Sequence, residues 1–254
     1  MPISQIAEVI TRLDEIVRRC HSSQNRMGYF AALYKRMTMA VNEGILQHAF
    51  EDGERMNRLD VVFAQRYLDA FDAYSSGGSC SSAWKFAFDC CKTNEMIVIQ
   101  HLLLGINTHI NLDLAIASAT VAPGDAINGL ANDFNRINSV IASLVDDVQE
   151  SLSRVWLPMR LLGKIADGRE RAVLNFSIDK ARETSWCNAL LLAAMDEEQQ
   201  GIYIQQMDQV VYKLAQGIRS PGPLAAMLVK TIHATEYDDV ARTIHLIDTA
   251  VVAA

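Results

Sequence analysis

The sequence predicts an all-α fold in which about eight to ten helices pack around a buried central helix. Three observations support this prediction. Apolar residues recur at helical spacing over long stretches, glycine and proline are scarce at 13 and 5 of 254 residues, and no strand–helix alternation is present. Half of the residues are hydrophobic, which is enough for a sizeable core. Nothing in the composition requires a division, so we expect a single domain over residues 1–254.

The first half of the chain contains four predicted helices before the central one. An apolar stripe over residues 3–20 predicts the first, with Ser4 as its N-cap, and a second is expected over residues 27–44. Asp52 is expected to cap a third helix at residues 54–74. After the serine- and glycine-rich loop 75–79, a short helix carries Trp84.

The central helix is predicted over residues 94–118, capped by Thr93 or Asn94. Pro123-Gly124-Asp125 interrupts the pattern, and a helical stripe resumes over residues 134–148. The remaining predicted helices cover residues 169–194, 197–216, 224–234 and 237–251. The loops between these segments are short, which favours antiparallel neighbours.

Charge and cysteine usage exclude several classes of protein. The net charge is −7 and the basic residues are not clustered, which argues against binding to nucleic acid. Five cysteines without a C-x-x-C pair are typical of free thiols in a reducing compartment. The N-terminus is charged and amphipathic, unlike a signal peptide, and the longest apolar run, residues 96–105, is too short to span a bilayer. We therefore expect a cytoplasmic protein with no membrane partner, whose oligomeric state, homo-oligomers included, stays open.

The central helix carries an unusual set of polar residues for a core segment. Buried polar groups cost several kcal/mol each unless they are hydrogen-bonded, so such a set indicates a use. At 100° per residue, they divide between two opposite sides of the helix. One side holds His101, Gly105, Thr108, His109 and Asp113, and the other holds Gln100, Asn107 and Asn111.

His109 and Asp113 are one helical turn apart on the same side, the spacing at which a carboxylate can contact an imidazole. Such a carboxylate fixes the tautomer and raises the basicity, as either a general base or a metal ligand requires. His101 would be the second acid, base or ligand, and Gly105 leaves space for a ligand or a partner helix. The alternative is a buried polar network that fixes the packing of one helix.

A divalent metal is one possible cofactor for this site, although no cofactor motif identifies one. A metal held by His101, His109 and Asp113 would need a further ligand from another helix. The candidates for that ligand are Asp60, Asp69 and Asp133.

Four more residues are candidates for substrate binding. Arg66 and Tyr67 could supply an anion clamp and a hydroxyl donor, but Arg66 could equally pair with Asp69 three residues later. Asn107 and Asn111 could donate to a substrate carbonyl. Because they face away from the histidines, we assign the two asparagines mainly to structure.

Two acidic motifs support a different hypothesis. The D-D-x-x-E spacing of Asp146, Asp147 and Glu150 resembles the motif that binds magnesium diphosphate in terpene synthases. Asn175, Asp179 and Glu183 resemble the second metal motif of that family, with Asp179 in place of Ser or Thr. The alternative is that these carboxylates are solvated helix faces.

Three segments together resemble a bacterial domain family of unknown function, whose members carry a G-x-N-A-H-I-N-x-D-L core motif. They are residues 29–38, residues 56–68 and Gly105-Ile-Asn-Thr-His-Ile-Asn-Leu-Asp-Leu114. Thr108 stands where the family usually has Ala. In the second half the resemblance rests on scattered residues such as Asn138, Arg182 and Trp186. It implies a helical fold and a site on the central helix, but no reaction.

The leading functional hypothesis is an enzyme acting on a small organic molecule by hydrolase or lyase/cyclase chemistry. His109 would be the general base or a metal ligand, oriented by Asp113, with His101 as its partner. The alternatives are a non-catalytic helical scaffold, a small-molecule-binding protein, and magnesium-dependent diphosphate chemistry.

Overall fold

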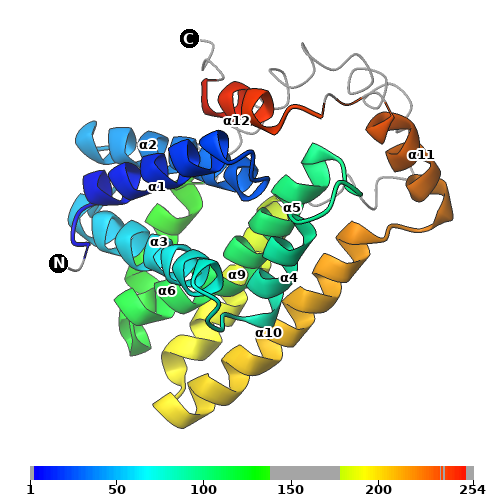
Figure 1. Cartoon of the computed structure of the whole chain (residues 1–254). Coiled ribbons are helices and arrows are strands. Elements are labelled where there is room, and N and C mark those ends of the chain that lie inside the picture. The colour runs from blue at the N-terminus through cyan, green and yellow to red at the C-terminus, as the bar shows by residue number, and fades with distance from the viewer. Residues whose placement is uncertain (1–2, 138–177, 235, 237, 250–254) are drawn as a thin grey trace.

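The computed structural model describes residues 3–137, 178–234, 236 and 238–249. Every regular element in these residues is a helix, which confirms the predicted all-α fold. In chain order the elements are α1 (Ile6–Ser22), α2 (Met27–Leu46), α3 (Gly53–Ser75), α4 (Ser82–Cys90), α5 (Val98–Thr108), η1 (His109–Leu114), α6 (Ala115–Val121), η2 (Gly124–Leu130), α9 (Ile178–Ala194), α10 (Glu197–Arg219), α11 (Pro223–His233) and α12 (Val240–Thr249) (Figure 1).

The starts of α3 and α1 show which helix caps could be predicted from the sequence. The side chain of Asp52 accepts a hydrogen bond from the backbone N–H of Arg55 at 2.8 Å, so the predicted cap of α3 is confirmed. The predicted cap of α1 is wrong, because the helix begins at Ile6 with Gln5 as N-cap. The backbone N–H groups of Ser4 and Gln5 donate instead to the Glu8 carboxylate, at 2.7 and 3.0 Å.

The central helix is one continuous rod made of α5, η1 and α6. It begins at Val98 rather than at residue 94, so the predicted caps Thr93 and Asn94 are wrong. The Gln100 side chain accepts from the N–H of Ile97 at 3.2 Å. The carboxylate of Glu236, far along the chain, accepts from the N–H of Val98 at 3.2 and 3.3 Å. No local pattern reveals a cap that arrives from so distant a residue.

The other helices bury the central helix along nearly its whole length, as expected. α2 and α4 contact α5, α3 contacts α6, and α9 contacts η1 (Figure 1). On the α10 side, Gln100 Nε2 donates to the carbonyl of Ile218 at 2.8 Å, and Asn107 Nδ2 donates to that of Val211 at 3.0 Å. Asn111 Nδ2 donates to Asn107 Oδ1 at 3.2 Å. These side-chain amides connect the central helix to α10, with Gln100 bound near the C-terminal end of α10.

The middle of the central helix differs from the uninterrupted α-helix that the sequence predicts. His109–Leu114 forms a π-helix, in which backbone hydrogen bonds span five residues instead of four. Such segments are wider than an α-helix and occur frequently at functional sites. The π-helix contains the two residues, His109 and Asp113, that the sequence selects as the centre of the site.

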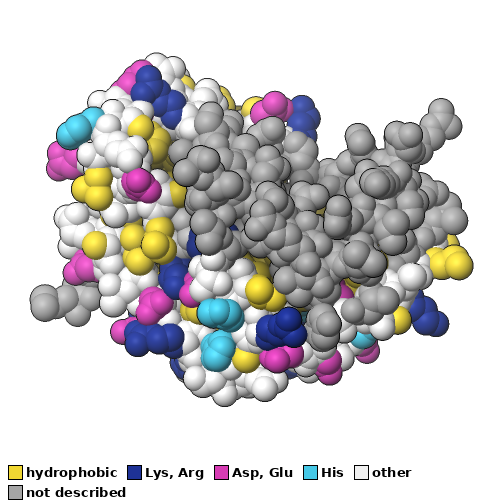
Figure 2. Space-filling model, turned by 90° about the horizontal axis from the view of Figure 1, so that it is seen from above, with side chains coloured by type: hydrophobic (Ala, Val, Ile, Leu, Met, Phe, Trp, Pro, Cys, Tyr) yellow, Lys and Arg dark blue, Asp and Glu magenta, His cyan; other side chains and the backbone are white. Residues whose placement is uncertain are grey.

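Val98–Val121 is long and apolar enough to cross a membrane by length and composition. Its most apolar window is fully buried in the structure, which is also the property of a core helix in a globular protein. All five cysteines are unbridged. On the face seen in Figure 2, acidic, basic and hydrophobic side chains alternate over the described residues without a broad basic patch.

Gly105 allows α2 to approach the central helix closely. A Cβ atom built on Gly105 would lie 2.3 Å from the Phe30 ring, well inside van der Waals contact. The space that this glycine leaves is therefore filled by Phe30 of α2, which corresponds to the partner-helix alternative rather than to a ligand.

We predict that Gly105→Ala lowers the free energy of unfolding by about 1–3 kcal/mol, because the added methyl group must displace Phe30. The matched control is Gly201→Ala in α10, where a Cβ would meet nothing within 4 Å. This control should be neutral or stabilising by about 0.5–1 kcal/mol, as for any Gly-to-Ala change inside a helix. Urea denaturation measures both, and equal effects of the two changes would contradict the close-approach role of Gly105.

Candidate functional site

The site is built around the Asp113 carboxylate, which is 1% exposed. Its Oδ2 lies 3.0 Å from His109 Nδ1 and accepts a hydrogen bond from Trp84 Nε1 at 2.8 Å. Its Oδ1 accepts from Arg66 Nε at 3.0 Å. Asp113 therefore joins η1, α3 and α4 at one point.

These contacts determine which nitrogen of His109 carries the proton. Trp84 and Arg66 can only donate, so both oxygens of Asp113 act as acceptors. Nδ1 of His109 then donates to Asp113, and Nε2 keeps a free electron pair. Burial lowers the pKa of His109 while Asp113 acts in the opposite direction, and the net lowering keeps the imidazole neutral near pH 7.

Aromatic rings enclose the His109 imidazole. The Phe63 ring is stacked on it, with centroids 3.6 Å apart and an interplanar angle of 10°. Tyr34 meets it edge-on at 4.4 Å, and Phe30 does so at 5.8 Å. This packing holds the ring in one orientation and keeps bulk water away from it.

A cavity of about 50 Å³ lies beside His109, between α2, α3 and the central helix. Two polar atoms of its lining residues, His109 Nε2 and Asp60 Oδ2, are buried without a hydrogen-bond partner in the described part of the chain, and the hydroxyl groups of Tyr34 and Thr38 are buried beside each other. Buried groups of this kind are rare in folded proteins and cost about 1–3 kcal/mol each. Their convergence on one cavity indicates a binding site for a small molecule or for water.

Asp60 is the second titratable group of the cavity. It lies on α3 and is 7% exposed. Burial raises the pKa of this carboxyl group to about 7. Near neutral pH, Asp60 is therefore present in both the protonated and the ionised form and can either donate or accept a proton.

The structure places His101 apart from this site. It precedes His109 by eight residues, about 12 Å along the helix axis, and Phe30 lies against Gly105 between the two positions. His101 Nδ1 instead lies 3.7 Å from Cys91 Sγ. Burial and the nearby Arg26 lower the pKa of His101 to about 4. Among the described residues, no group of three or more His, Cys, Asp or Glu side chains could hold a metal ion, so His101 does not join His109 and Asp113 in such a set.

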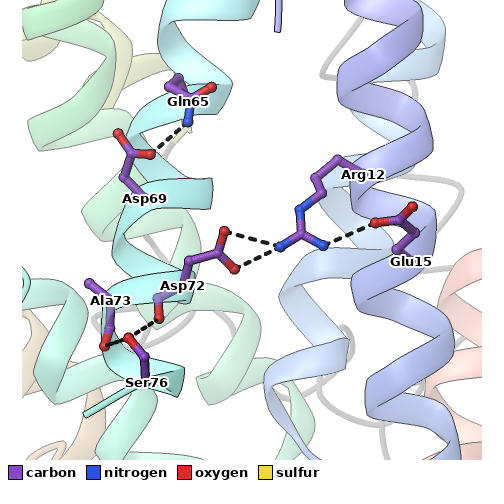
Figure 3. A network of polar contacts seen from close by, with 7 residues as sticks. All are labelled: Arg12, Glu15, Gln65, Asp69, Asp72, Ala73 and Ser76. Carbon is purple, nitrogen blue, oxygen red and sulfur yellow. Dashed lines mark hydrogen bonds and ion pairs between the residues drawn. The ribbon is translucent and has the colours of Figure 1, made fainter. Parts of the chain in front are cut away.

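Of the three carboxylates considered as further ligands, only Asp60 shares a cavity with His109. Asp69 accepts a hydrogen bond from Gln65 Nε2 at 2.6 Å on α3, beside the ion pair between Arg12 and Asp72 that links α1 to α3 (Figure 3). Asp133 accepts from the N–H groups of residues 51 and 52, at 2.7 and 3.1 Å, and from an arginine of α3. Asp69 and Asp133 therefore stabilise the fold away from the cavity.

Arg66 and Tyr67, the substrate contacts predicted on α3, lie outside the lining of the cavity. Arg66 pairs with Asp113 and not with Asp69, so its Nε is committed to holding the carboxylate. Tyr67 is fully buried and packs edge-on against Phe30 at 5.2 Å. Neither residue lines the cavity, and the two asparagines of the central helix face α10.

The acidic motifs considered for diphosphate chemistry fall largely outside the described residues. These are Asp146, Asp147, Glu150 and Asn175. In α9, Glu183 is exposed and pairs with Lys180 Nζ at 2.6 Å. Asp179 also belongs to α9.

Three contributors to the site are not predicted from the sequence. The sequence predicts Trp84 on a short helix and assigns it no role. Its Nε1–H nevertheless donates the shortest of the hydrogen bonds that Asp113 accepts. Tyr34 and Thr38 supply hydroxyl groups to the cavity. Their four-residue spacing on α2 places both on one helix face, a signal that becomes informative only when the facing helix is known.

Comparisons with known proteins add one match. The model of a family described as "Family of unknown function (DUF5995)" matches residues 6–221. No curated protein and no solved structure matches the chain.

We predict that Asp113→Asn lowers the free energy of unfolding by about 2–4 kcal/mol, because it leaves the buried donors of Trp84 and His109 and the partly buried guanidinium of Arg66 without a charged acceptor. Asp72→Asn is the control, since Asp72 also accepts from an arginine but is half exposed. That change should cost less than about 1 kcal/mol. Chemical denaturation compares the two, and similar losses would show that the Asp113 contacts are not a structural centre.

We predict that Asp60→Asn stabilises the protein at pH 8 by about 1–3 kcal/mol, because the amide avoids the cost of ionising a buried carboxyl group that lacks a partner. The folded-state pKa of Asp60, about 7, is above the usual aspartate value of 3.8. Its contribution is therefore favourable below pH 3.8 and is lost as the pH rises through 7.

At pH 4 the gain from Asp60→Asn should be close to zero. Asp69→Asn, on the exposed side of the same helix, serves as the control and should show no such difference between pH 4 and pH 8. A gain from Asp60→Asn that is the same at both values would contradict the raised pKa.

Proposed function

Because the chain belongs to the DUF5995 family, whose function is unknown, we propose a function from the site around His109: an enzyme that moves protons on a small organic molecule. His109 is the general base and Asp60 is the second acid or base. The reaction is of the hydrolase or lyase/cyclase type. The observation that carries the proposal is the unpartnered His109 Nε2, which faces an apolar cavity while Nδ1 is bound to Asp113.

The proposed chemistry begins with proton transfer to His109. Nε2 takes a proton from a substrate O–H or C–H group, or from a water molecule that attacks the substrate. The imidazolium that forms is stabilised by the Asp113 carboxylate, 3.0 Å from Nδ1. Protonated Asp60 gives its proton to the oxygen on which negative charge develops, which balances the first transfer.

The surroundings of the site favour this use. The aromatic and aliphatic wall lowers the local dielectric constant, which strengthens the attraction between the imidazolium and Asp113. Arg66 and Trp84 keep the carboxylate in place, so that little reorganisation accompanies the charge change. A general base is most effective when its neutral form predominates at working pH, and burial of His109 has this effect.

A second candidate is a small-molecule-binding protein without turnover. The observation that favours it is the tight aromatic enclosure of His109, which would suit retention of a ligand as well as its conversion. The two candidates differ in one measurable outcome, because only the enzyme changes the ligand chemically.

We predict that the wild-type chain converts at least one member of a panel of small esters, lactones and β-hydroxy ketones, followed by proton NMR. His109→Gln should lower the rate at least about 100-fold, the usual contribution of a general base. Asp60→Asn should lower it about as strongly. His245→Gln, an exposed histidine on α12, should leave the rate unchanged.

If binding is found and no member is converted, the binding-protein candidate replaces the enzyme. Conversion that survives in folded His109→Gln protein would contradict the assigned base. The diphosphate hypothesis has a separate test, because it predicts that Mg²⁺ with pyrophosphate raises the melting temperature.

A further inference from the structure

We propose a second ligand site, a cleft that binds the phosphate group of a small organic molecule through Arg19, Lys85 and Lys92. The inference goes beyond the proposed function, because no described residue lines both this cleft and the cavity beside His109. Three features of the cleft support it: its volume, the charges along its wall, and an arginine without an acidic partner.

The cleft lies where the C-terminal ends of α1 and α3 meet α4, and its volume is about 800 Å³. Its wall combines the last turn of α1, residues from the segment 74–80, the side chains of α4 and the start of α2. Pockets that bind small organic molecules typically have volumes of about 300–1,000 Å³. The cleft is therefore large enough for a complete small ligand.

Positive charge predominates along the wall. Arg19, Lys85 and Lys92 line the cleft, and Asp89 is the one acidic residue among its described lining residues. Asp72, near the same end of α3, pairs with an arginine of α1 at 2.8 Å and does not line the cleft (Figure 3). In a chain with a net charge of −7, a cleft with an excess of positive charge favours an anionic ligand.

Arg19 has no acidic partner among the residues that the structure describes. It is exposed in the last turn of α1, and its guanidinium carbon lies 5.3 Å from the centre of the Phe71 ring. Phe71 is 1% exposed, so this contact holds the guanidinium against a fixed ring without using its N–H groups. Those groups can bind two oxygens of a phosphate at once.

Asp89 positions the two lysines of the cleft. Its Oδ2 lies 2.6 Å from Lys85 Nζ, its Oδ1 lies 2.9 Å from Lys92 Nζ, and the Tyr74 hydroxyl donates to Oδ1 at 2.7 Å. The hydrogen bond from Lys85, followed by those from Tyr74 and Lys92, holds the pKa of Asp89 well below its usual value. The carboxylate therefore stays ionised near neutral pH. Each ammonium group has three N–H donors, so both lysines keep donors for a ligand.

The loop between α3 and α4 leaves the cleft open. Gly77 has a φ of 80°, and a Cβ atom built on it would meet nothing within 4 Å. The loop then folds back, and the N–H of Gly78 donates to the Ala73 carbonyl at 2.7 Å. This contact satisfies a carbonyl at the end of α3, whose partial negative charge would otherwise oppose an anion. Ser79 adds a hydroxyl group to the wall.

A phosphate group suits these donors better than a carboxylate does. A phosphate monoester carries about two negative charges near neutral pH and has three strong acceptor oxygens. One guanidinium and two ammonium groups can supply both the charge and the donors that it requires. Because the cleft is much larger than a phosphate ion, we expect a phosphate ester of a small organic molecule rather than free phosphate.

The experiment measures binding to the whole chain by isothermal titration calorimetry at pH 8 and low ionic strength, with EDTA present so that no divalent metal contributes. The probes are phenyl phosphate, inorganic phosphate, and phthalate, which carries its two charges on carboxylates. We expect phenyl phosphate to bind most tightly, because inorganic phosphate lacks the organic body and phthalate lacks the phosphate oxygens.

Variants of the exposed side chains assign the site. Arg19→Gln and Lys92→Gln should each weaken phenyl phosphate about tenfold or more, the usual effect of losing a hydrogen bond to a charged group. Arg19→Lys keeps the charge but loses the planar fork, so it should restore only part of the affinity.

Arg18→Gln is the matched control. It removes the same charge from the neighbouring residue of α1, but Arg18 pairs with Asp14 at 3.0 Å and does not line the cleft. The change should alter the affinity for phenyl phosphate less than about twofold, because exposed charges outside the site are screened by solvent.

The inference is overturned if phenyl phosphate does not bind, or if phthalate binds as tightly. It is also overturned if Arg18→Gln weakens binding as much as Arg19→Gln, which would indicate attraction to surface charge in general. Inorganic phosphate that binds as tightly as phenyl phosphate would contradict the organic part of the ligand and identify free phosphate as its source.

Discussion

The buried Asp113 carboxylate is the constraint on which the rest of the structure depends. An isolated charge at this depth would cost many kcal/mol, so the fold must bring donors to it. They come from three places in the chain: Arg66 on α3, Trp84 on α4 and His109 one turn away. Satisfying one carboxylate thus fixes the relative position of two helices, the tautomer of the imidazole and the face of η1 that meets the cavity.

The sequence contained the local part of this arrangement and lacked the long-range part. Helix positions follow from apolar periodicity, and the His109–Asp113 contact follows from four-residue spacing, because both depend on near neighbours. The separation of His101 depends on Phe30, and the role of Trp84 depends on its distance from Asp113. Neither has a local signature. Residue spacing therefore predicts the contact between His109 and Asp113. It predicts neither the position of His101 apart from that contact nor the hydrogen bond from Trp84.

The two sides of the central helix follow opposite rules of polar satisfaction. Toward α10, the side-chain amides of Gln100, Asn107 and Asn111 all find partners, which anchors the rod. Toward α2 and α3, His109 Nε2 and the Oδ2 atom of Asp60 on α3 are buried without a hydrogen-bond partner among the residues that the structure describes. Sites that must receive a ligand commonly carry such a cost, and the anchored side supplies the rigidity that keeps the opposite side open to binding.

The π-helical segment His109–Leu114 also has a consequence for how this family of sequences can change. A π-turn holds roughly one residue more than an α-turn, as a single-residue insertion would produce. Deleting one residue there would restore α-helical winding and leave the helix beyond it in nearly the same orientation, because five α-helical residues turn through about the same angle as the six residues of the wider π-segment. The small residues of α6 would therefore still face α3. Loss of one residue would therefore alter the backbone that carries His109 and Asp113 while leaving the packing of α6 in place, so the width of this segment serves the site rather than the fold.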